Sequence, residues 1–151
     1  MYTNSPISYN GVLGFLYVAK RFVHLYRRNI AMTRHLVIST MNDLVRITPD
    51  SVIYISSEGN YSTLMLRDGN ARIVTVQLGQ IEKMIAAQLG AEGNIFIRIG
   101  KSLIINRSYI YYINISRQQL MLSNVETFSY TVAASKEALK QLKELLDSEV
   151  K

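Results

Sequence analysis

The sequence predicts a mostly antiparallel β domain with two helices, and three observations lead to this class. From Arg34 onward, short runs rich in Val, Ile, Thr and Tyr alternate between apolar and polar residues, a pattern typical of half-buried strands. Glycine, proline, asparagine and aspartate separate successive runs, as expected for turns between strands. Two longer segments, 78–89 and 134–148, instead repeat their apolar residues at helical spacing.

Residues 1–33 are expected to form an N-terminal extension that is separate from this domain and is either helical or disordered. Residues 12–30 read as a basic amphipathic helix, because apolar side chains recur at spacings of three and four while Arg27 and Arg28 lie largely off that stripe. Two interpretations stay open: an arm that contacts a membrane surface or phosphates, and an extension that packs loosely or not at all. A start at Met32 would remove the segment and leave the rest of the chain intact.

Five strands are expected before the first helix of the domain, over residues 34–40, 43–47, 51–57, 61–67 and 71–76. Between the last two, Asp68-Gly69 is a strong hairpin signal, because glycine tolerates the positive φ that tight hairpin turns require. Helix 78–89 follows, with leucine and isoleucine at helical spacing, and ends at Gly90, a residue type that commonly terminates helices.

Five more strands are expected between the two helices, over residues 95–99, 103–106, 109–115, 118–122 and 126–132. The closing helix, 134–148, has leucines along one face and lysines along the other. We expect Lys140 and Lys143 to belong simply to a solvated helix face.

The formal net charge of the chain is +6, but the distribution of charge matters more than the sum. Residues 1–42 hold five basic residues and no acidic residue, whereas residues 43–151 hold 12 basic and 11 acidic residues. The domain is therefore almost neutral, so contact with a polyanion must come from a local arrangement of a few cations. The chain has no cysteine, which excludes disulfides and thiolate metal sites and fits a reducing, cytoplasmic compartment.

No catalytic, metal-binding or cofactor-binding pattern stands out. Neither His24 nor His35 has a carboxylate at a spacing typical of a catalytic triad or a metal site. Residues 100–102, Gly-Lys-Ser, match the end of the phosphate-binding loop G-x-x-x-x-G-K-[ST]. However, position 95 is Ile rather than Gly, and Leu-Ile-Ile-Asn follows instead of the start of a helix. We therefore expect no nucleotide-hydrolysing activity, no other catalysis and no cofactor.

Four blocks of the sequence resemble the LytTR DNA-binding domain family. The most specific is NIFIRIGKSLIINRSYI at 94–110, which is similar to the family signature Phe-x-Arg-[Ile/Val]-x-[Lys/Arg/Asn]-Ser-x-x-[Val/Ile]-Asn-x-x-x-Ile. The others are VIYISSEGNY at 52–61, LGQIEKMI at 78–85 and VAASKEALKQL at 132–142. One block alone would be weak evidence, but these four occur in order and on the expected elements.

The resemblance implies an elongated domain of about ten antiparallel strands in three sheets with short helices, over residues 34–148. It implies a bacterial transcriptional regulator whose loops, rather than a recognition helix, enter successive major grooves of double-stranded DNA. It further implies tandem or imperfect repeat sites, occupied by two copies as a homodimer on DNA. Because the segment ahead of the domain is too short for a receiver domain, we expect a stand-alone regulator or one controlled by a separate partner.

Carried over by position, the resemblance assigns DNA contacts mainly to three loops. Asn60 in the first loop would donate to a base edge or a phosphate. In the second loop, Lys101 would reach guanine or a phosphate and the Ser102 hydroxyl a phosphate. In the third, the amides at the start of the last helix would meet phosphate. The full expected set of DNA-binding residues is Asn60, Lys101, Ser102, Arg107, Ser135 and Lys136.

Two positions depart from the family pattern. Gly100 stands where the family commonly has His, and Ala133-Ala134 aligns with Ser-Arg, of which the Arg is a major DNA contact. A shifted alignment puts Ser135-Lys136 there instead, which restores a hydroxyl and a cation but strains the helix register. The departures leave the fold expectation intact and imply that DNA contact depends on other cations, that affinity is reduced, or that the domain has drifted toward another role.

Several residues in these motifs also have structural interpretations. We expect Asn106 to cap the short turn that follows it. Arg98 is as consistent with an exposed or salt-bridged strand residue as with a DNA contact. Tyr109, Tyr111 and Tyr112 resemble a stacking platform for single strands, but in a strand of this composition we expect core and cross-strand partners.

One alternative to the function of a DNA-binding regulator stays open. In it, the chain is a non-catalytic protein-interaction or membrane-associated module that has lost specific DNA readout, and the basic helix 12–30 docks on anionic lipid or on a partner.

Overall fold

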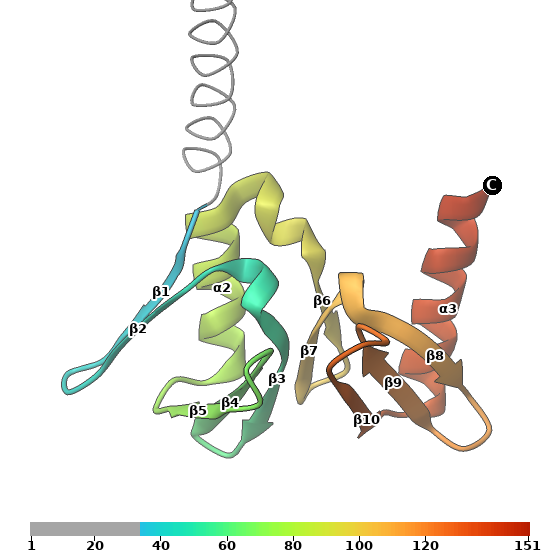
Figure 1. The fold of residues 1–151 in the computed structure, drawn as a ribbon, viewed down its shortest axis with the longest axis horizontal. Helices are drawn as coiled ribbons and strands as arrows, with labels where there is room; N and C mark the ends of the chain where they lie inside the picture. The colour runs from blue at the N-terminus through green and yellow to red at the C-terminus, as the bar shows by residue number, and fades with distance from the viewer. Residues whose placement is uncertain (1–33) are drawn as a thin grey trace, which may run out of the picture. The chain divides into compact units, whose positions relative to one another are not determined.

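The computed structural model describes residues 34–151, so the expected helix over 12–30 lies outside the described residues. Ten strands in three antiparallel sheets and two helices make up the described part (Figure 1), which confirms the expected fold class. The strands are β1 (Leu36–Ser39), β2 (Leu44–Ile47), β3 (Val52–Glu58), β4 (Tyr61–Leu66), β5 (Ala71–Val74), β6 (Phe96–Ile99), β7 (Leu103–Asn106), β8 (Ile110–Asn114), β9 (Gln119–Ser123) and β10 (Ser129–Ala133). The helices are α2 (Leu78–Leu89) and α3 (Lys136–Val150).

The largest sheet has five strands in the order β5-β4-β3-β7-β6. The central strand β3 and its neighbour β7 begin with the apolar runs VIYI and LII, because both faces of the sheet are covered there. All four residues of β7 are buried. β3 pairs with β7 from Tyr54 opposite Ile105 to Ser56 opposite Leu103. This pairing joins segments that are far apart in the sequence and thereby fixes which turns become neighbours.

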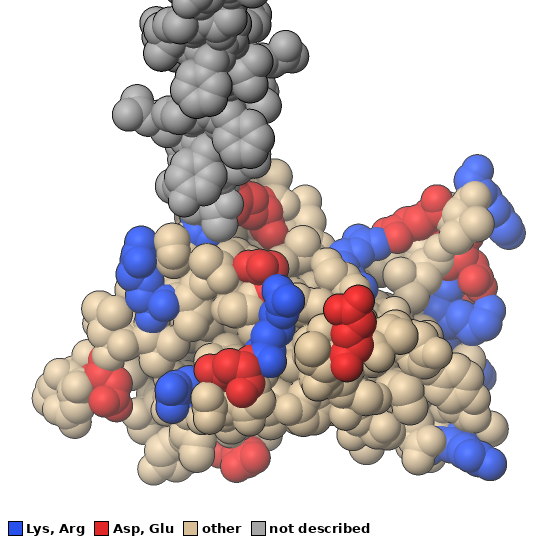
Figure 2. Space-filling view, viewed as in Figure 1, with Lys and Arg blue, Asp and Glu red and all other residues tan. Residues whose placement is uncertain are grey.

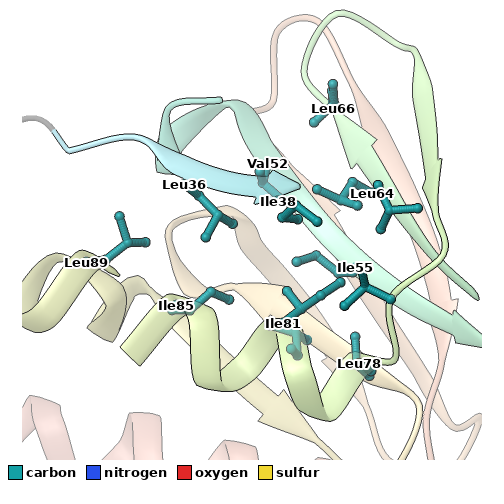
Figure 3. Close-up of a cluster of buried hydrophobic side chains, with 13 residues drawn as sticks. Leu36, Ile38, Val52, Ile55, Leu64, Leu66, Leu78, Ile81, Ile85 and Leu89 are labelled. Carbon is teal, nitrogen blue, oxygen red and sulfur yellow. The ribbon is translucent and has the colours of Figure 1, made fainter. Parts of the chain in front are cut away.

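Helix α2 and strand β1 cover one face of the five-stranded sheet (Figure 3). The apolar residues that the sequence places at helical spacing are all buried: Leu78, Ile81, Ile85 and Leu89. Gln88 fastens β1 to the helix, because its side chain accepts a hydrogen bond from the Val37 amide and donates one to the Val37 carbonyl, both at 2.8 Å.

The other face is covered by the sheet β10-β9-β8 together with α3. This second buried cluster draws residues from both layers: Ile53, Ile99, Leu103, Ile105, Leu120, Leu122, Leu139 and Leu142. In β3, Val52 and Ile55 belong to the first cluster and Ile53 to the second. One strand thus serves both clusters, because neighbouring side chains of a strand point to opposite faces. The register shift between Val52 and Tyr54 changes the alternation there and puts Val52 and Ile55 on the same face.

The tyrosines around β8 differ in part from the expectation. Tyr109, just before the strand, packs edge-on against Phe128 with ring centroids 5.1 Å apart, as expected for a core partner. Tyr111 and Tyr112 are 61% and 50% exposed, so the expectation that they are core residues was wrong, whereas Tyr112 has the expected cross-strand partner, Met121. β8 is an edge strand with a register shift between Ile110 and Tyr112, and such a bulge lets two adjacent side chains both avoid the core.

The strand expected over 126–132 begins only at Ser129. The residues before it form a tight turn in which the Asn124 side chain accepts from the amides of Thr127 at 2.9 Å and Phe128 at 3.0 Å. Bonds of this kind satisfy the backbone locally and so compete with strand pairing.

Candidate nucleic-acid interface

Four connections between elements lie along one edge of the described domain, at the bottom of the view in Figure 1. We call this row the loop edge, and it consists of the β3–β4 turn (58–61), the β6–β7 turn (100–102), the β8–β9 turn (115–118) and the β10–α3 junction (134–136).

Contacts join the neighbouring members of the loop edge. The Ser57 amide donates to the Ser102 carbonyl at 2.8 Å, which ties the end of β3, next to the β3–β4 turn, to the β6–β7 turn. Gly100 and Ala138 line one shallow cavity between β6 and α3, which places the β6–β7 turn beside the start of α3. The Ala134 amide donates to the carbonyl of Gln118 at 3.2 Å and joins the β10–α3 junction to the β8–β9 turn.

Arg98 holds the β6–β7 turn from one side. Its Nε donates to the Gly100 carbonyl at 3.0 Å, and its Nη2 donates to the Lys101 carbonyl at 2.6 Å. Its Nη1 forms an ion pair with Glu82 of α2 at 2.9 Å, so the interpretation of Arg98 as a salt-bridged residue is confirmed. Gly100 has φ +61°, a conformation that glycine adopts readily. The turn therefore presents the exposed Lys101 and Ser102 from a well-held backbone.

The β3–β4 turn contains Gly59, at φ +66°, and the exposed Asn60. The side-chain oxygen Oδ1 of Asn60 accepts a hydrogen bond from the side-chain amide of Gln77 at 3.2 Å. This bond orients the Asn60 side chain, whose own NH₂ group remains a donor for an outside partner. Gln77 was not among the residues expected from the sequence, because a pairing between positions 17 apart leaves no local signal.

At the β10–α3 junction, Ser135 is the N-cap of α3. Its hydroxyl oxygen accepts from the Ala138 amide at 3.2 Å, and both Ser135 and Lys136 are exposed. The first turn of a helix carries unpaired amides and a partial positive charge. This junction therefore offers amides, a hydroxyl and a cation in the same place.

Arg107 is the one expected site residue that the structure does not bring to the loop edge. It follows β7, at the opposite end of that strand from Lys101, and forms an ion pair with Glu149 near the end of α3. Next to it, Asn106 is fully buried and caps the Arg107–Tyr109 turn by accepting from the Ser108 amide at 3.0 Å. The capping role expected for Asn106 is thereby confirmed.

Basic and acidic side chains are intermixed on the face shown in Figure 2, and no large basic patch is visible there. Among the described residues, Lys101, Arg117 and Lys136 form no ion pair, although all three are exposed on the loop edge. Arg117 was not expected from the sequence, because the segment between the eighth and ninth strands was interpreted only as a connection.

Within residues 34–151, no group of three or more acidic or histidine side chains is placed to hold a metal ion. Neither described helix is long and apolar enough to cross a bilayer.

Comparisons with known proteins agree with the fold of the described domain. The sequence model of a family described as the LytTr DNA-binding domain matches residues 42–147. A solved structure with the same fold is the LytTr DNA-binding domain of a protein assigned as a methyl-accepting/DNA response regulator from Bacillus cereus. It is 16% identical, with a TM-score of 0.52, and the alignment covers 75% of this chain and 96% of that one. No curated protein matches the chain.

Proposed function

The chain belongs to the LytTr DNA-binding domain family, and from this premise we propose that it is a transcriptional regulator that binds specific sequences in double-stranded DNA. The binding surface is the loop edge, whose turns enter the major groove. The protein acts without catalysis or a cofactor, in the cytoplasm where its DNA partner lies. Two copies bind to tandem or imperfect repeats.

The observation that carries this proposal is the row of exposed polar side chains on turns that are held by hydrogen bonds. Asn60, Lys101, Ser102, Ser135 and Lys136 all lie on the loop edge and are all exposed. A surface whose backbone is already ordered loses less conformational entropy when it binds. A few unpaired cations on such a surface suffice for a domain that is otherwise almost neutral.

The side chains divide into those that fix position and those that read sequence. Ser102, Ser135 and the amides at the start of α3 suit phosphate oxygens, which carry no sequence information. Lys101 and Asn60 have donors that match acceptors on guanine and adenine in the major groove. Arg107 is left out of this surface because of its position and its ion pair.

A titration of the full chain against duplexes from the DNA upstream of its own gene tests the proposal. We expect Lys101→Ala to weaken binding to the preferred duplex by about 1–3 kcal/mol if Lys101 reads a base. The matched control is Lys151→Ala, which removes an exposed lysine just past the far end of α3 and is expected to leave the affinity unchanged.

Two results would contradict the proposal. One is an affinity that is equal for all duplexes, and the other is unchanged specific binding in Asn60→Ala, Lys101→Ala and Lys136→Ala alike. The membrane or protein-interaction alternative concerns residues 12–30, and liposome co-sedimentation of the chain with and without residues 1–31 measures that contribution separately.

A further inference from the structure

Arg117 lies on the loop edge in a turn that its own backbone and side chains hold in place. The Asn114 side-chain oxygen accepts from the Arg117 amide at 3.0 Å and from the Ser116 hydroxyl at 2.8 Å. The Gln118 amide donates to the Ile115 carbonyl at 3.1 Å, and Gln118 has φ +55°. These three hydrogen bonds hold the β8–β9 turn in a defined shape.

The same turn is bonded to the start of α3. The Gln118 carbonyl accepts from the Ala134 amide at 3.2 Å, and Ala134 directly precedes the N-cap Ser135. Arg117 is thus next in sequence to a residue that contacts the β10–α3 junction. The junction itself has a single cation, Lys136, because the positions before Ser135 are alanines.

The guanidinium of Arg117 makes no hydrogen bond or ion pair among residues 34–151, and the side chain is exposed. In contrast, Arg67, Arg98 and Arg107 each have a carboxylate partner. Glu137, the acid closest in sequence to this junction, accepts a hydrogen bond from Gln141 one turn further along α3. An unpaired arginine on a well-held turn is available to an anion from outside.

We propose that Arg117 is a further DNA contact and that its guanidinium binds a backbone phosphate beside the phosphate contacted by the start of α3. This inference rests on the proposed function and assigns a contact to the β8–β9 turn, the one connection of the loop edge for which the proposed function names no DNA-binding residue. Arginine suits the role because its planar group presents several donors in a geometry that matches two phosphate oxygens.

The experiment measures the affinity of the full chain for its preferred upstream duplex and for a random-sequence duplex over a range of salt concentrations. A lost phosphate contact lowers both affinities together, because phosphates are common to all sequences. For Arg117→Gln we expect about fivefold weaker binding to both duplexes at low salt. We also expect the slope of log affinity against log salt concentration to be smaller in magnitude by about 0.9. Arg117→Lys should keep most of the slope, because it keeps the charge.

The matched control is Arg107→Gln, which removes an arginine at the opposite end of the domain and is expected to leave both affinities and the slope unchanged. The thermal midpoint of each variant checks that folding is intact. If Arg117→Gln keeps wild-type affinity and slope while Lys101→Ala weakens specific binding, this inference is wrong and the proposed function stands. If Arg117→Gln weakens only the preferred duplex, Arg117 reads a base, and the phosphate assignment is overturned. If the wild-type chain binds neither duplex, both proposals fail.

Discussion

At the scale of single residues, Arg98 connects the fold to the proposed site. Its guanidinium bonds the carbonyls of Gly100 and Lys101 and pairs with Glu82. Lysine has the same charge and three donors, but all three are on one nitrogen, so it cannot reach the acceptors that Nε, Nη1 and Nη2 of Arg98 reach separately. Under the proposed function, Arg98 therefore affects DNA binding through Lys101 and Ser102, as a positioning residue.

We expect Arg98→Lys to loosen the β6–β7 turn while the domain stays folded. Amide hydrogen exchange at residues 100–102 should become faster, and binding to the preferred duplex should weaken by roughly tenfold, on the order of 1.4 kcal/mol. The midpoint of thermal unfolding should move little, because the side chain is partly exposed and outside both clusters.

The matched control for this prediction is Glu82→Gln. It removes the ion pair with Arg98 and leaves the two carbonyl bonds in place, and partly exposed ion pairs contribute little to stability. If Arg98→Lys and Glu82→Gln show the same amide exchange rates at residues 100–102, the bonds from Arg98 to the two carbonyls do not hold the turn. That result contradicts the positioning role of Arg98.

At the scale of elements, the start of α3 combines a structural role with a proposed binding role in one side chain. Ser135 caps the helix through the Ala138 amide, and it also lies on the loop edge. Two substitutions separate these roles, because aspartate is as good an N-cap as serine but carries a negative charge.

We expect Ser135→Ala to lower the free energy of unfolding by about 1 kcal/mol, measured by urea denaturation. Ser135→Asp should keep the stability and yet bind DNA much more weakly, since it places a carboxylate against phosphate. If Ser135→Asp binds DNA as well as the wild-type chain, the β10–α3 junction does not face DNA.

The elements themselves could be predicted from the sequence, because each depends on a local pattern. All ten strands and both described helices occur where alternation or helical spacing indicates them, and Asp68-Gly69 forms the expected hairpin turn between β4 and β5. The late start of β10 could not be foreseen, because it depends on side-chain bonds made by Asn124.

The candidate site could be predicted less completely than the fold. The resemblance supplied Asn60, Lys101, Ser102, Ser135 and Lys136, which the structure brings to one edge. It also included Arg107, which lies elsewhere, and it gave no signal for Arg117 or Gln77. Which turns become neighbours depends on pairing between distant strands, such as β3 with β7, and no local pattern encodes that pairing.

At the scale of the whole domain, the two hydrophobic clusters share the five-stranded sheet. Because β3 and β7 contribute side chains to both clusters, loss of either cluster exposes the other face of the same strands. The described domain should therefore unfold as one cooperative unit rather than as two.

We test this with Leu64→Ala in the first cluster and Leu139→Ala in the second, both fully buried. Each should lower the free energy of unfolding by about 2–5 kcal/mol, and far-UV circular dichroism and tyrosine fluorescence should report one common midpoint in each variant. Separate midpoints for the two probes in either variant would show that the clusters unfold independently.

The β6–β7 and β8–β9 turns, at 100–102 and 115–118, contribute no residue to the buried members of either cluster. Under the proposed function, selection can change Lys101 in the β6–β7 turn, and with it the preferred DNA sequence, while the strands that carry the turn keep their register. Ile115 of the β8–β9 turn packs against the second cluster, so the β6–β7 turn is the segment in which new DNA preferences can be engineered without repacking the interior.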